Sequence, residues 1–453
     1  MANLPEDFIR ETKLLMGSER FSRYMEAFDE EAPVSIRLNP QPLGDGSSVA
    51  DPKAPNCSQP PKNRPRMAEQ VPWCEEGYYL EGRPQFTFDP LFHAGCYYVQ
   101  EAASMFITHI LRTILSPLTS HQGILSPLTS HLSPLTILDL CAAPGGKSTA
   151  MLSVLPNDAT LVSNEPIPTR AQILLENITK WGAKNCIVTN NYPRDFRKAK
   201  ARFDIILCDV PCSGEGMFRK DPATIGEWSL QNVEKCWRLQ REIVADAWEC
   251  LNPGGILIYS TCTFNTKENE ENVRWIMDTY DAEPIAIPTE PSWNITGSLL
   301  EGFDAPVYRF IPGITRSEGL FVAALKKRGK WKEEREERKE ERGKRKENTL
   351  ANEKLDKNKF IKILDLGNLF PLSTFLFPQQ TINLSYPEAL RYLRGEALVL
   401  PADTPKGIVT VTYKGFPLGP VKNIGNRANN LYPKPWRIKT THLPTEPVEV
   451  ISL

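Results

Sequence analysis

Two cysteines, Cys212 and Cys262, each follow an apolar, strand-like run and stand among polar turn residues. The first comes after "FDIILC", an acid at Asp209 and a proline, and the second ends the run "GGILIYSTC". A cysteine at such a place can act as a nucleophile if its thiolate is favoured. Four other cysteines are expected to be small buried hydrophobes, the commoner fate of a single cysteine; they are Cys186, Cys208, Cys236 and Cys250.

Two thiols that face one crevice suit methyl transfer to carbon 5 of a pyrimidine. That carbon is a poor nucleophile until a thiolate adds to carbon 6, and the adduct is undone by loss of the carbon 5 proton and expulsion of the thiolate. One cysteine would therefore make the bond and the other would help to break it, and the spacing alone does not assign the two roles. Asp209 could hold the base at its N3 edge if it is protonated or shares a proton during addition.

The segment "ILDLCAAPGGKST" sets Pro-Gly-Gly between a buried strand and a helix, where a ligand can approach the backbone closely. A P-loop would need glycine five residues before Gly146, where Cys141 stands, and no G-x-G-x-x-G occurs. Glu165 follows the second strand-like run and could accept hydrogen bonds from ribose hydroxyls. A ligand with a ribose and no phosphate fits best, and S-adenosylmethionine is the common one. The alternative is a tight turn that binds nothing.

Strands and helices alternate from residue 136 onward, which predicts a parallel sheet covered on both faces. Ligands of such sheets bind beyond the carboxyl ends of the strands, so both cysteines should share that crevice. Strands are expected at 137–140, 160–163, 186–189, 203–208, 255–259 and 320–325, and helices at 147–155, 169–181, 229–251 and 266–279.

The flanking segments differ in character. Residues 4–30 have helical periodicity, a Pro/Ser-rich loop runs from 43 to 65, and a helix is expected at 99–113. Ser-Pro-Leu-Thr occurs three times between residues 116 and 136, too short a unit for a stacked repeat fold, so we interpret it as a duplicated surface loop. The run 326–347 is almost wholly charged, and we expect a solvated helix or a linker here, with 327–358 as the linker range.

Length and composition limit the classes of protein. A chain of 453 residues predicts two or three domains, and no apolar run reaches the roughly 18 residues of a membrane helix. The beginning of the sequence has acids where a secretion leader has basic residues, so a cytoplasmic protein is expected. Ten cysteines without a Cys-x-x-Cys pair, and five histidines without a cluster, favour reduced thiols and no metal site.

The chain resembles the RNA cytosine-5 methyltransferases of the NOL1/NOP2/Sun family in three motifs, "DLCAAPGGKST", "CDVPCSGEGMFRKDP" and "YSTCTFNTKENEENV". "RLN", "YYVQEAASM" and "SEGLFVAAL" extend the likeness over most of residues 33–325. The resemblance implies an α/β fold with a Rossmann-like, class I S-adenosylmethionine-dependent sheet. It also implies that Cys262 attacks and that Cys212 assists release, whereas DNA cytosine-5 methyltransferases attack with the Pro-Cys cysteine. The cofactor-binding residues that it implies are Cys141, Ala142, Ala143, Pro144, Gly145, Gly146, Lys147, Glu165, Tyr192 and Asp209.

The last part of the chain is similar to the PUA-like domain of the bacterial F-type enzymes that methylate 16S ribosomal RNA. From Lys406 to Lys439 it has seven Lys or Arg residues and no acid, which could contact phosphates. Its aromatic residues are expected to stack on unpaired bases; they are Tyr413, Phe416, Tyr432 and Trp436.

The resemblance favours a monomer that acts on ribosomal RNA. Transfer RNA as the substrate, or a role as a non-catalytic assembly factor, remains an alternative. The expected domains are an RNA-binding module at 1–85, a catalytic domain at 86–326 with the repeated loop inserted at 114–136, a linker at 327–358 and the PUA-like domain at 359–453.

One departure from the family concerns "TNNYPRDF", where the family often has an acid near Tyr192 that contacts the adenosine. That contact is expected to pass to Asn191, to backbone groups or to Asp195.

Overall fold

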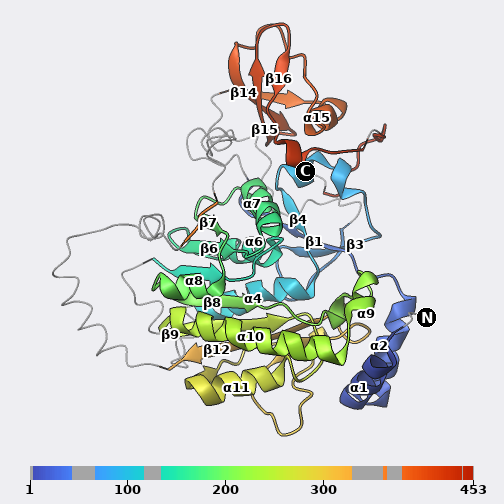
Figure 1. Ribbon diagram of the computed structural model, residues 1–453. Helices are drawn as coiled ribbons and strands as arrows, with labels where there is room; N and C mark the ends of the chain where they lie inside the picture. Colours follow the sequence, from blue (N-terminus) through green and yellow to red (C-terminus); the bar gives the residue numbers. More distant parts are fainter. Residues whose placement is uncertain are drawn as a thin grey trace, which may run out of the picture. The chain divides into compact units, whose positions relative to one another are not determined.

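The computed structural model describes residues 4–42, 67–116, 134–328, 361–364, 380–440 and 442–451 (Figure 1). The chain forms two compact units. The first contains Met1–Pro33, Glu101–Leu174 and Asn185–Ile363, and the second contains Val34–Gln100, Leu175–Lys184 and Leu364–Leu453. Most of the Pro/Ser-rich loop, of the repeated loop and of the charged linker lies outside the described residues.

The first unit is built on an eight-stranded sheet in the order β10-β12-β9-β8-β5-β6-β7, with β11 paired to β12. Five strands are parallel, as predicted. They are β5 (Thr136–Asp139), β6 (Thr160–Asn164), β7 (Cys186–Thr189), β8 (Phe203–Asp209) and β9 (Leu251–Thr261). Each begins and ends within a few residues of the range expected from its apolar run.

The remaining strands of this sheet correct the prediction of a wholly parallel sheet. β12 (Leu320–Lys327) runs antiparallel to β9, and it pairs antiparallel with β10 (Ala282–Pro284) and β11 (Tyr308–Phe310) as well. A parallel strand needs a connection that returns the chain to its starting edge. Here β11 ends at the same edge of the sheet as β9. β12 therefore starts at that edge and runs in the opposite direction.

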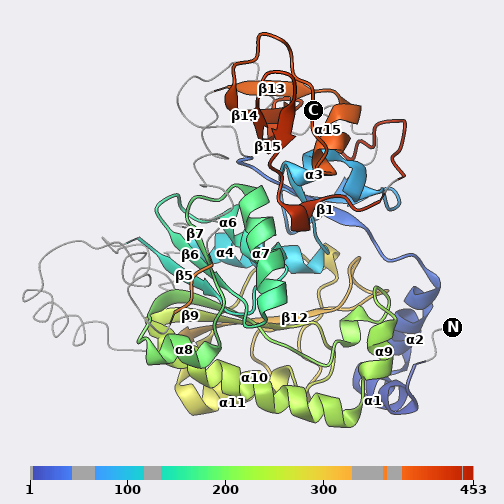
Figure 2. The same cartoon turned by 45° about the horizontal axis from the view of Figure 1, so that its top comes forward.

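Helices cover both faces of the sheet, as predicted. α4 (Phe106–Leu115) and α6 (Gly146–Leu152) lie on one face, and α8 (Pro193–Lys198), α10 (Leu230–Cys250) and α11 (Glu270–Tyr280) lie on the other (Figures 1 and 2). Ser229 caps the beginning of α10, because its hydroxyl accepts a hydrogen bond from the backbone N–H of Asn232 at 3.1 Å. The helix expected at 99–113 begins later, because the Glu101 carboxylate accepts from the N–H groups of Ala103 and Ser104 and fixes a short turn there.

The first helices of the chain, α1 (Glu6–Met16) and α2 (Ser18–Glu26), belong to this first unit. Phe8 meets Phe218 edge-on at 5.0 Å between ring centroids, and Tyr24 meets Phe264 at 5.4 Å. These rings form one buried cluster with Trp228. The N-terminal module expected at 1–85 is therefore divided between the two units, because the apolar partners of its first helices stand in a distant part of the sequence.

The second unit contains two four-stranded sheets. One has the order β2-β3-β1-β4 and the other the order β13-β14-β15-β16. The strands are β1 (Ser35–Leu38), β2 (Met67–Gln70), β3 (Gly77–Leu80), β4 (Tyr97–Val99), β13 (Thr381–Leu384), β14 (Gly407–Tyr413), β15 (Phe416–Asn423) and β16 (Ala428–Asn430). A single core joins Ile36 and Leu91 to Leu390 of α15 (Tyr386–Leu393) and to Val411. Residues far apart in the sequence thus share one hydrophobic interior.

Three of the four aromatic residues expected to stack on bases are part of this core, so that prediction is wrong for them. Tyr413 and Phe416 are each 6% exposed and Tyr432 is 2% exposed. Trp436 is only partly buried, and the Lys180 ammonium lies 5.6 Å from its ring centroid. These aromatic rings pack in the core beside aliphatic side chains such as Leu390 and Val411.

Candidate active site

Asn164, at the end of β6, joins three adjacent strand ends. Its side-chain amide donates to the carbonyl of Leu140 at 3.0 Å and to that of Asn191 at 2.9 Å. Its Oδ1 accepts from the Thr189 hydroxyl at 2.9 Å. The side chain is buried, so these bonds fix the carboxyl edge of β5, β6 and β7 where a ligand is expected.

The glycine loop follows β5 and leads into α6. The Ala143–Pro144 peptide is cis, and Gly145 has φ of +114°, in the region that favours glycine. Ser148 donates to Asp139 Oδ2 at 2.6 Å. Burial raises the pKa of Asp139 to about 7, and its Oδ1 has no hydrogen-bond partner. Asp139 was not predicted from the sequence, although an acid at the end of an apolar strand was a signal.

Glu165 lies at the same edge and is 1% exposed. Its Oε1 accepts from the backbone N–H of Ile167 at 2.9 Å, and Arg170 Nη1 lies 3.6 Å from Oε2. Oε2 accepts no hydrogen bond, although it is buried. Arg170 also donates to the Ala143 carbonyl at 3.0 Å, which ties the glycine loop to this acid. A buried carboxylate oxygen left without a donor fits a ligand that brings hydroxyl groups.

Tyr192 is 55% exposed, and Arg194 lies 4.9 Å from its ring centroid. Its backbone N–H donates to Asp195 Oδ2 at 3.0 Å. The side chain of Asn191 accepts from the N–H of Lys362 at 2.8 Å and donates to the carbonyl of that residue at 3.1 Å. The expected substitutes for the missing acid, Asn191 and Asp195, thus bond to the chain itself, and a cofactor contact at Tyr192 stays a prediction.

Asp209, at the end of β8, forms an ion pair with Lys147, whose Nζ lies 2.8 Å from Oδ2. The Ser260 hydroxyl donates to Oδ1 at 2.7 Å. Burial lowers the pKa of Lys147, but the attraction and hydrogen bond of Asp209 outweigh it and the net shift is upward. The raised pKa keeps the proton on Lys147, and the expected contact of Asp209 with the N3 edge of the base stays a prediction.

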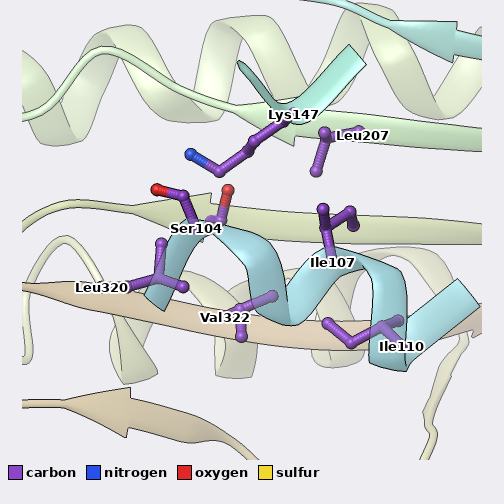
Figure 3. A pocket seen from close by; sticks show the side chains of 8 residues that line it. Ser104, Ile107, Ile110, Lys147, Leu207, Leu320 and Val322 are labelled. Carbon is purple, nitrogen blue, oxygen red and sulfur yellow. The ribbon is translucent and has the colours of Figure 1, made fainter. Parts of the chain in front are cut away.

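A cavity opens beside this pair. Ser104, from the short turn before α4, lines it together with Ile107 and Ile110 of α4, and Lys147 extends along the opposite wall (Figure 3). The remaining lining residues are Leu207, Ser260, Leu320 and Val322. Lys147 therefore faces this mainly apolar cavity as well as the Asp209 carboxylate.

The two cysteines singled out by the sequence meet in the structure. Their Sγ atoms are 3.1 Å apart, and the backbone N–H of Cys262 donates to Cys212 Sγ at 3.3 Å. Both side chains are partly buried and neither is in a disulfide. The hydrogen bond with Cys262, followed by burial, raises the pKa of Cys212 well above its usual value. Cys212 therefore keeps its proton to a higher pH than an ordinary thiol does.

The other cysteines differ in burial. Cys208 and Cys250 are fully buried, as predicted, with 0% and 1% exposure. Cys186 and Cys236 are only partly buried. Burial nevertheless raises the pKa of Cys186 to about 12 and that of Cys236 to about 11, so neither thiol is activated.

A buried carboxylate, Glu215, joins two loops, the one after β8 that contains Cys212 and the one after β9 that contains Cys262. Its Oε2 accepts from the N–H groups of Phe264 at 2.6 Å and of Asn265 at 3.0 Å. Its Oε1 accepts from the Trp228 indole at 3.0 Å. The N–H of Gly216 donates to the carbonyl of Cys262 at 2.7 Å. Sequence reasoning missed Glu215, because the backbone groups that bind it belong to the other cysteine loop, far along the chain.

Replacing Gly216 by alanine should disturb both loops. A Cβ there would lie 2.6 Å from Gly319 Cα and 2.7 Å from the Cys262 carbonyl oxygen, and both are backbone atoms. We expect Gly216→Ala to lower the free energy of unfolding by about 1–3 kcal/mol, measured by urea denaturation. Gly226→Ala is the matched control, because its Cβ would have no atom within 4 Å. Equal stability of the two variants would contradict the prediction.

Three family models match the chain in order. They are the N-terminal domain of 16S rRNA methyltransferase RsmF at residues 4–102, 16S rRNA methyltransferase RsmB/F at 128–326, and the methyltransferase RsmF PUA domain at 379–438. The chain belongs to the F-type branch of the NOL1/NOP2/Sun family. The resemblance stated from the sequence is thereby confirmed.

Two relatives of the F-type branch illustrate the extent of the match. Ribosomal RNA small subunit methyltransferase F of Pectobacterium atrosepticum is 36% identical over 267 residues, covering 58% of this chain and 51% of the relative. The protein of the same name from an Enterobacter species is 29% identical over 415 residues, covering 80% and 83%. The most similar stretch thus spans about half the length of several such relatives.

Solved structures confirm the fold class. A methyltransferase homolog from Pyrococcus horikoshii has a TM-score of 0.52 and 25% identity, covering 72% of this chain and 100% of its own. NSun6 from Pyrococcus horikoshii with SFG has a TM-score of 0.54 and 19% identity, covering 73% and 100%. The first unit therefore has the class I methyltransferase fold, and the family match gives the end of the chain its PUA-like assignment.

Two features are missing from the described residues. Outside the segments that the structure leaves undescribed, no group of His, Cys, Asp or Glu could hold a metal ion. Within the same described ranges, no helix is both long and apolar enough to cross a membrane.

Proposed function

We propose that this protein transfers a methyl group from S-adenosylmethionine to carbon 5 of a cytosine in 16S ribosomal RNA, in the cytoplasm. The observation that carries the proposal is the meeting of Cys212 and Cys262, whose sulfurs are 3.1 Å apart. The strands that precede them, β8 and β9, are neighbours in the sheet. Membership of a family described as 16S rRNA methyltransferases supports this substrate.

In the proposed reaction, Cys262 adds to carbon 6 of the base and makes carbon 5 nucleophilic. Cys212 keeps its proton and donates to the other sulfur, which stabilises Cys262 as a thiolate both before attack and during its departure. Asp209 lies at the end of β8 and Lys147 in the first turn of α6, where a carboxylate and an ammonium group can hold the polar edge of the base. Attack requires an exposed base, so the target is an unpaired or flipped cytosine.

The residues around the glycine loop fit the cofactor. The unpartnered Oε2 of Glu165 can accept from ribose hydroxyls, and residues 141–147 let the ligand approach the backbone. When bound there, S-adenosylmethionine supplies an activated methyl group. The contact with its adenine ring is the one that we assign to backbone groups near Tyr192.

Glu165→Ala should weaken binding of S-adenosylmethionine by about 10- to 100-fold, the range for loss of a charged hydrogen-bond partner. Isothermal titration calorimetry on the full chain measures the change. Asp158→Ala, which removes an exposed acid from the same unit, is the control and should bind normally. Unchanged affinity in Glu165→Ala would remove the proposed ribose contact.

The second unit is proposed to bind RNA through cations at one end of its β14–β16 sheet. Lys406, Lys422 and Arg427 are exposed there, and β15 and β16 pair directly beside them. The buried aromatic rings leave phosphate contacts as the main attraction. Deleting residues 359–453 would not test this role, because residues 34–100 share their core with them.

Point substitutions test the RNA contact without breaking that core. The triple variant Lys406→Ala, Lys422→Ala and Arg427→Ala should bind 16S ribosomal RNA more weakly. The plot of log affinity against log salt should become shallower by about one for each phosphate that the variant no longer neutralises. Lys13→Ala, an exposed cation on α1, should leave the slope unchanged. The same slope in the triple variant would exclude these three cations from the interface.

The reaction itself is tested by incubating the protein with S-adenosylmethionine and 16S ribosomal RNA, small ribosomal subunits or transfer RNA. We expect 5-methylcytosine in the ribosomal substrates by nucleoside mass spectrometry, and bisulfite sequencing of RNA from cells with and without the gene would name the nucleotide. Product in transfer RNA alone would favour the first alternative. Binding without methyl transfer would favour an assembly factor.

A further inference from the structure

Glu268 lies six residues after Cys262 and is fully buried. Its Oε2 accepts from the backbone N–H of Ser213, the residue after Cys212, at 3.0 Å. The same oxygen accepts from the Gln240 amide at 2.6 Å, and that amide also donates to the Pro211 carbonyl at 2.9 Å. Glu268 therefore belongs to the loop that contains Cys262 and binds the backbone of the loop that contains Cys212. Glu215 makes the reverse connection, from the Cys212 loop to the Cys262 loop.

The side chain of Asn265 lies between the two buried carboxylates. Its Nδ2 is 2.9 Å from Glu215 Oε1 and 2.8 Å from Glu268 Oε1. Both oxygens of Glu268 thus accept from N–H donors, an arrangement that suits the ionised form. Burial, with the neighbouring Glu215 adding to it, raises the pKa of Glu268 to about 7, so the group carries its charge in the alkaline range where thiols titrate.

A negative charge at this place opposes ionisation of a nearby thiol. Repulsion by Glu268 contributes to the raised pKa of Cys212, after the sulfur–sulfur hydrogen bond with Cys262, burial and the charge on Cys262. It also contributes, after burial, to the raised pKa of Cys236 on α10. The other ionisable groups that face this cluster are Lys147, Glu215, Lys235 and Tyr259.

We infer that Glu268 is a positioning residue that binds the Cys212 loop to the Cys262 loop and whose negative charge keeps the proton on Cys212. The inference rests on the proposed function, in which Cys262 attacks and Cys212 remains a thiol. It gives a physical reason for the division of labour between two sulfurs that are otherwise alike. Two neighbouring thiols become unequal because the carboxylate reaches the backbone beside only one of them.

The test measures alkylation of Cys212 by iodoacetamide between pH 7 and 9, followed by peptide mass spectrometry, in the full chain carrying Cys262→Ser. We expect Glu268→Gln to increase the rate for Cys212 about 3- to 10-fold at each pH, which corresponds to a pKa lower by about 0.5–1 unit. The rate for Cys236 should increase as well. Glu268→Asp keeps the charge and should leave the Cys212 rate near that of the parent.

Glu271→Gln removes an acid from the first turn of α11, three residues after Glu268, and is the matched control, expected to leave both rates unchanged. A Cys212 rate that does not increase in a folded Glu268→Gln variant would overturn the inference, as would an equal increase in Glu268→Asp. If Glu268→Gln does not fold, the unsubstituted protein provides the test. Cys262 should be alkylated faster than Cys212 throughout this pH range. The reverse order would overturn the inference. No RNA is present, so the result is independent of whether methyl transfer is observed.

Discussion

Cys262→Ala is expected to abolish both methyl transfer and covalent attachment to RNA, whereas Cys212→Ala should accumulate the attached RNA. Loss of the nucleophile removes the step that activates carbon 5, so we expect a fall in rate of at least about 10⁴-fold. Loss of Cys212 leaves the attacking sulfur in place and removes the donor, now 3.1 Å away, that stabilises its departure. The adduct therefore forms and persists.

Denaturing gels with labelled RNA, or with a labelled methyl donor, measure the adduct directly. Cys236→Ala is the matched control, because it removes a partly buried thiol on α10 that takes no part in the proposed reaction. It should form product at the normal rate and accumulate no adduct. Adducts in Cys262→Ala and none in Cys212→Ala would reverse the two roles.

Glu270→Ala should lower the free energy of unfolding by about 3–5 kcal/mol, the cost of leaving one member of a buried ion pair alone. Glu270 accepts from Arg309 Nη2 at 2.5 and 2.6 Å, and both side chains are 0% exposed. Arg309 also donates to the Phe264 carbonyl, two residues after Cys262. The substitution would leave the buried guanidinium without its ion-pair partner and weaken its support of the loop that contains Cys262.

Urea denaturation measures the change, and Glu283→Ala is the control. Glu283 pairs with Arg328 at 3.6 Å on the surface, where both side chains are more than half exposed, so the loss should be below about 1 kcal/mol. The double replacement Glu270→Leu with Arg309→Met should recover much of the stability, since it leaves no buried charge. Equal losses in the buried and surface variants would contradict the prediction.

The parallel strands could be predicted because each is a short apolar run that ends at polar residues, and burial on both faces demands such a run. The same reasoning identified Cys212 and Cys262, since both follow these strand ends. The direction of β12 could not be predicted this way. An apolar run such as 320–325 has the same pattern whichever way the strand runs, and only the course of β11 decides it.

The hydrogen bonds of Glu215 and Glu268 to the two cysteine loops could not be predicted from the sequence, for another reason. Glu215 and Glu268 look like ordinary surface acids in "CSGEGMF" and "TKENEEN", and nothing local indicates that each is buried against the other loop. The opposite error was made for Tyr413, Phe416 and Tyr432, which were predicted to be exposed to RNA and are buried. Their basic surroundings favour contact with RNA, but burial depends on partners such as Leu390 that only the folded unit supplies.

The docking of α1 and α2 has a consequence for the order in which the protein is made. Phe8 and Tyr24 leave the ribosome early, but Phe218, Trp228 and Phe264, which cover them, are synthesised much later. Until these three residues have been synthesised, the aromatic side chains of α1 and α2 lack the rings that bury them in the folded protein. Contacts so distant in sequence form slowly and invite aggregation meanwhile. Recombinant production at low temperature or with added chaperones should therefore raise the soluble yield.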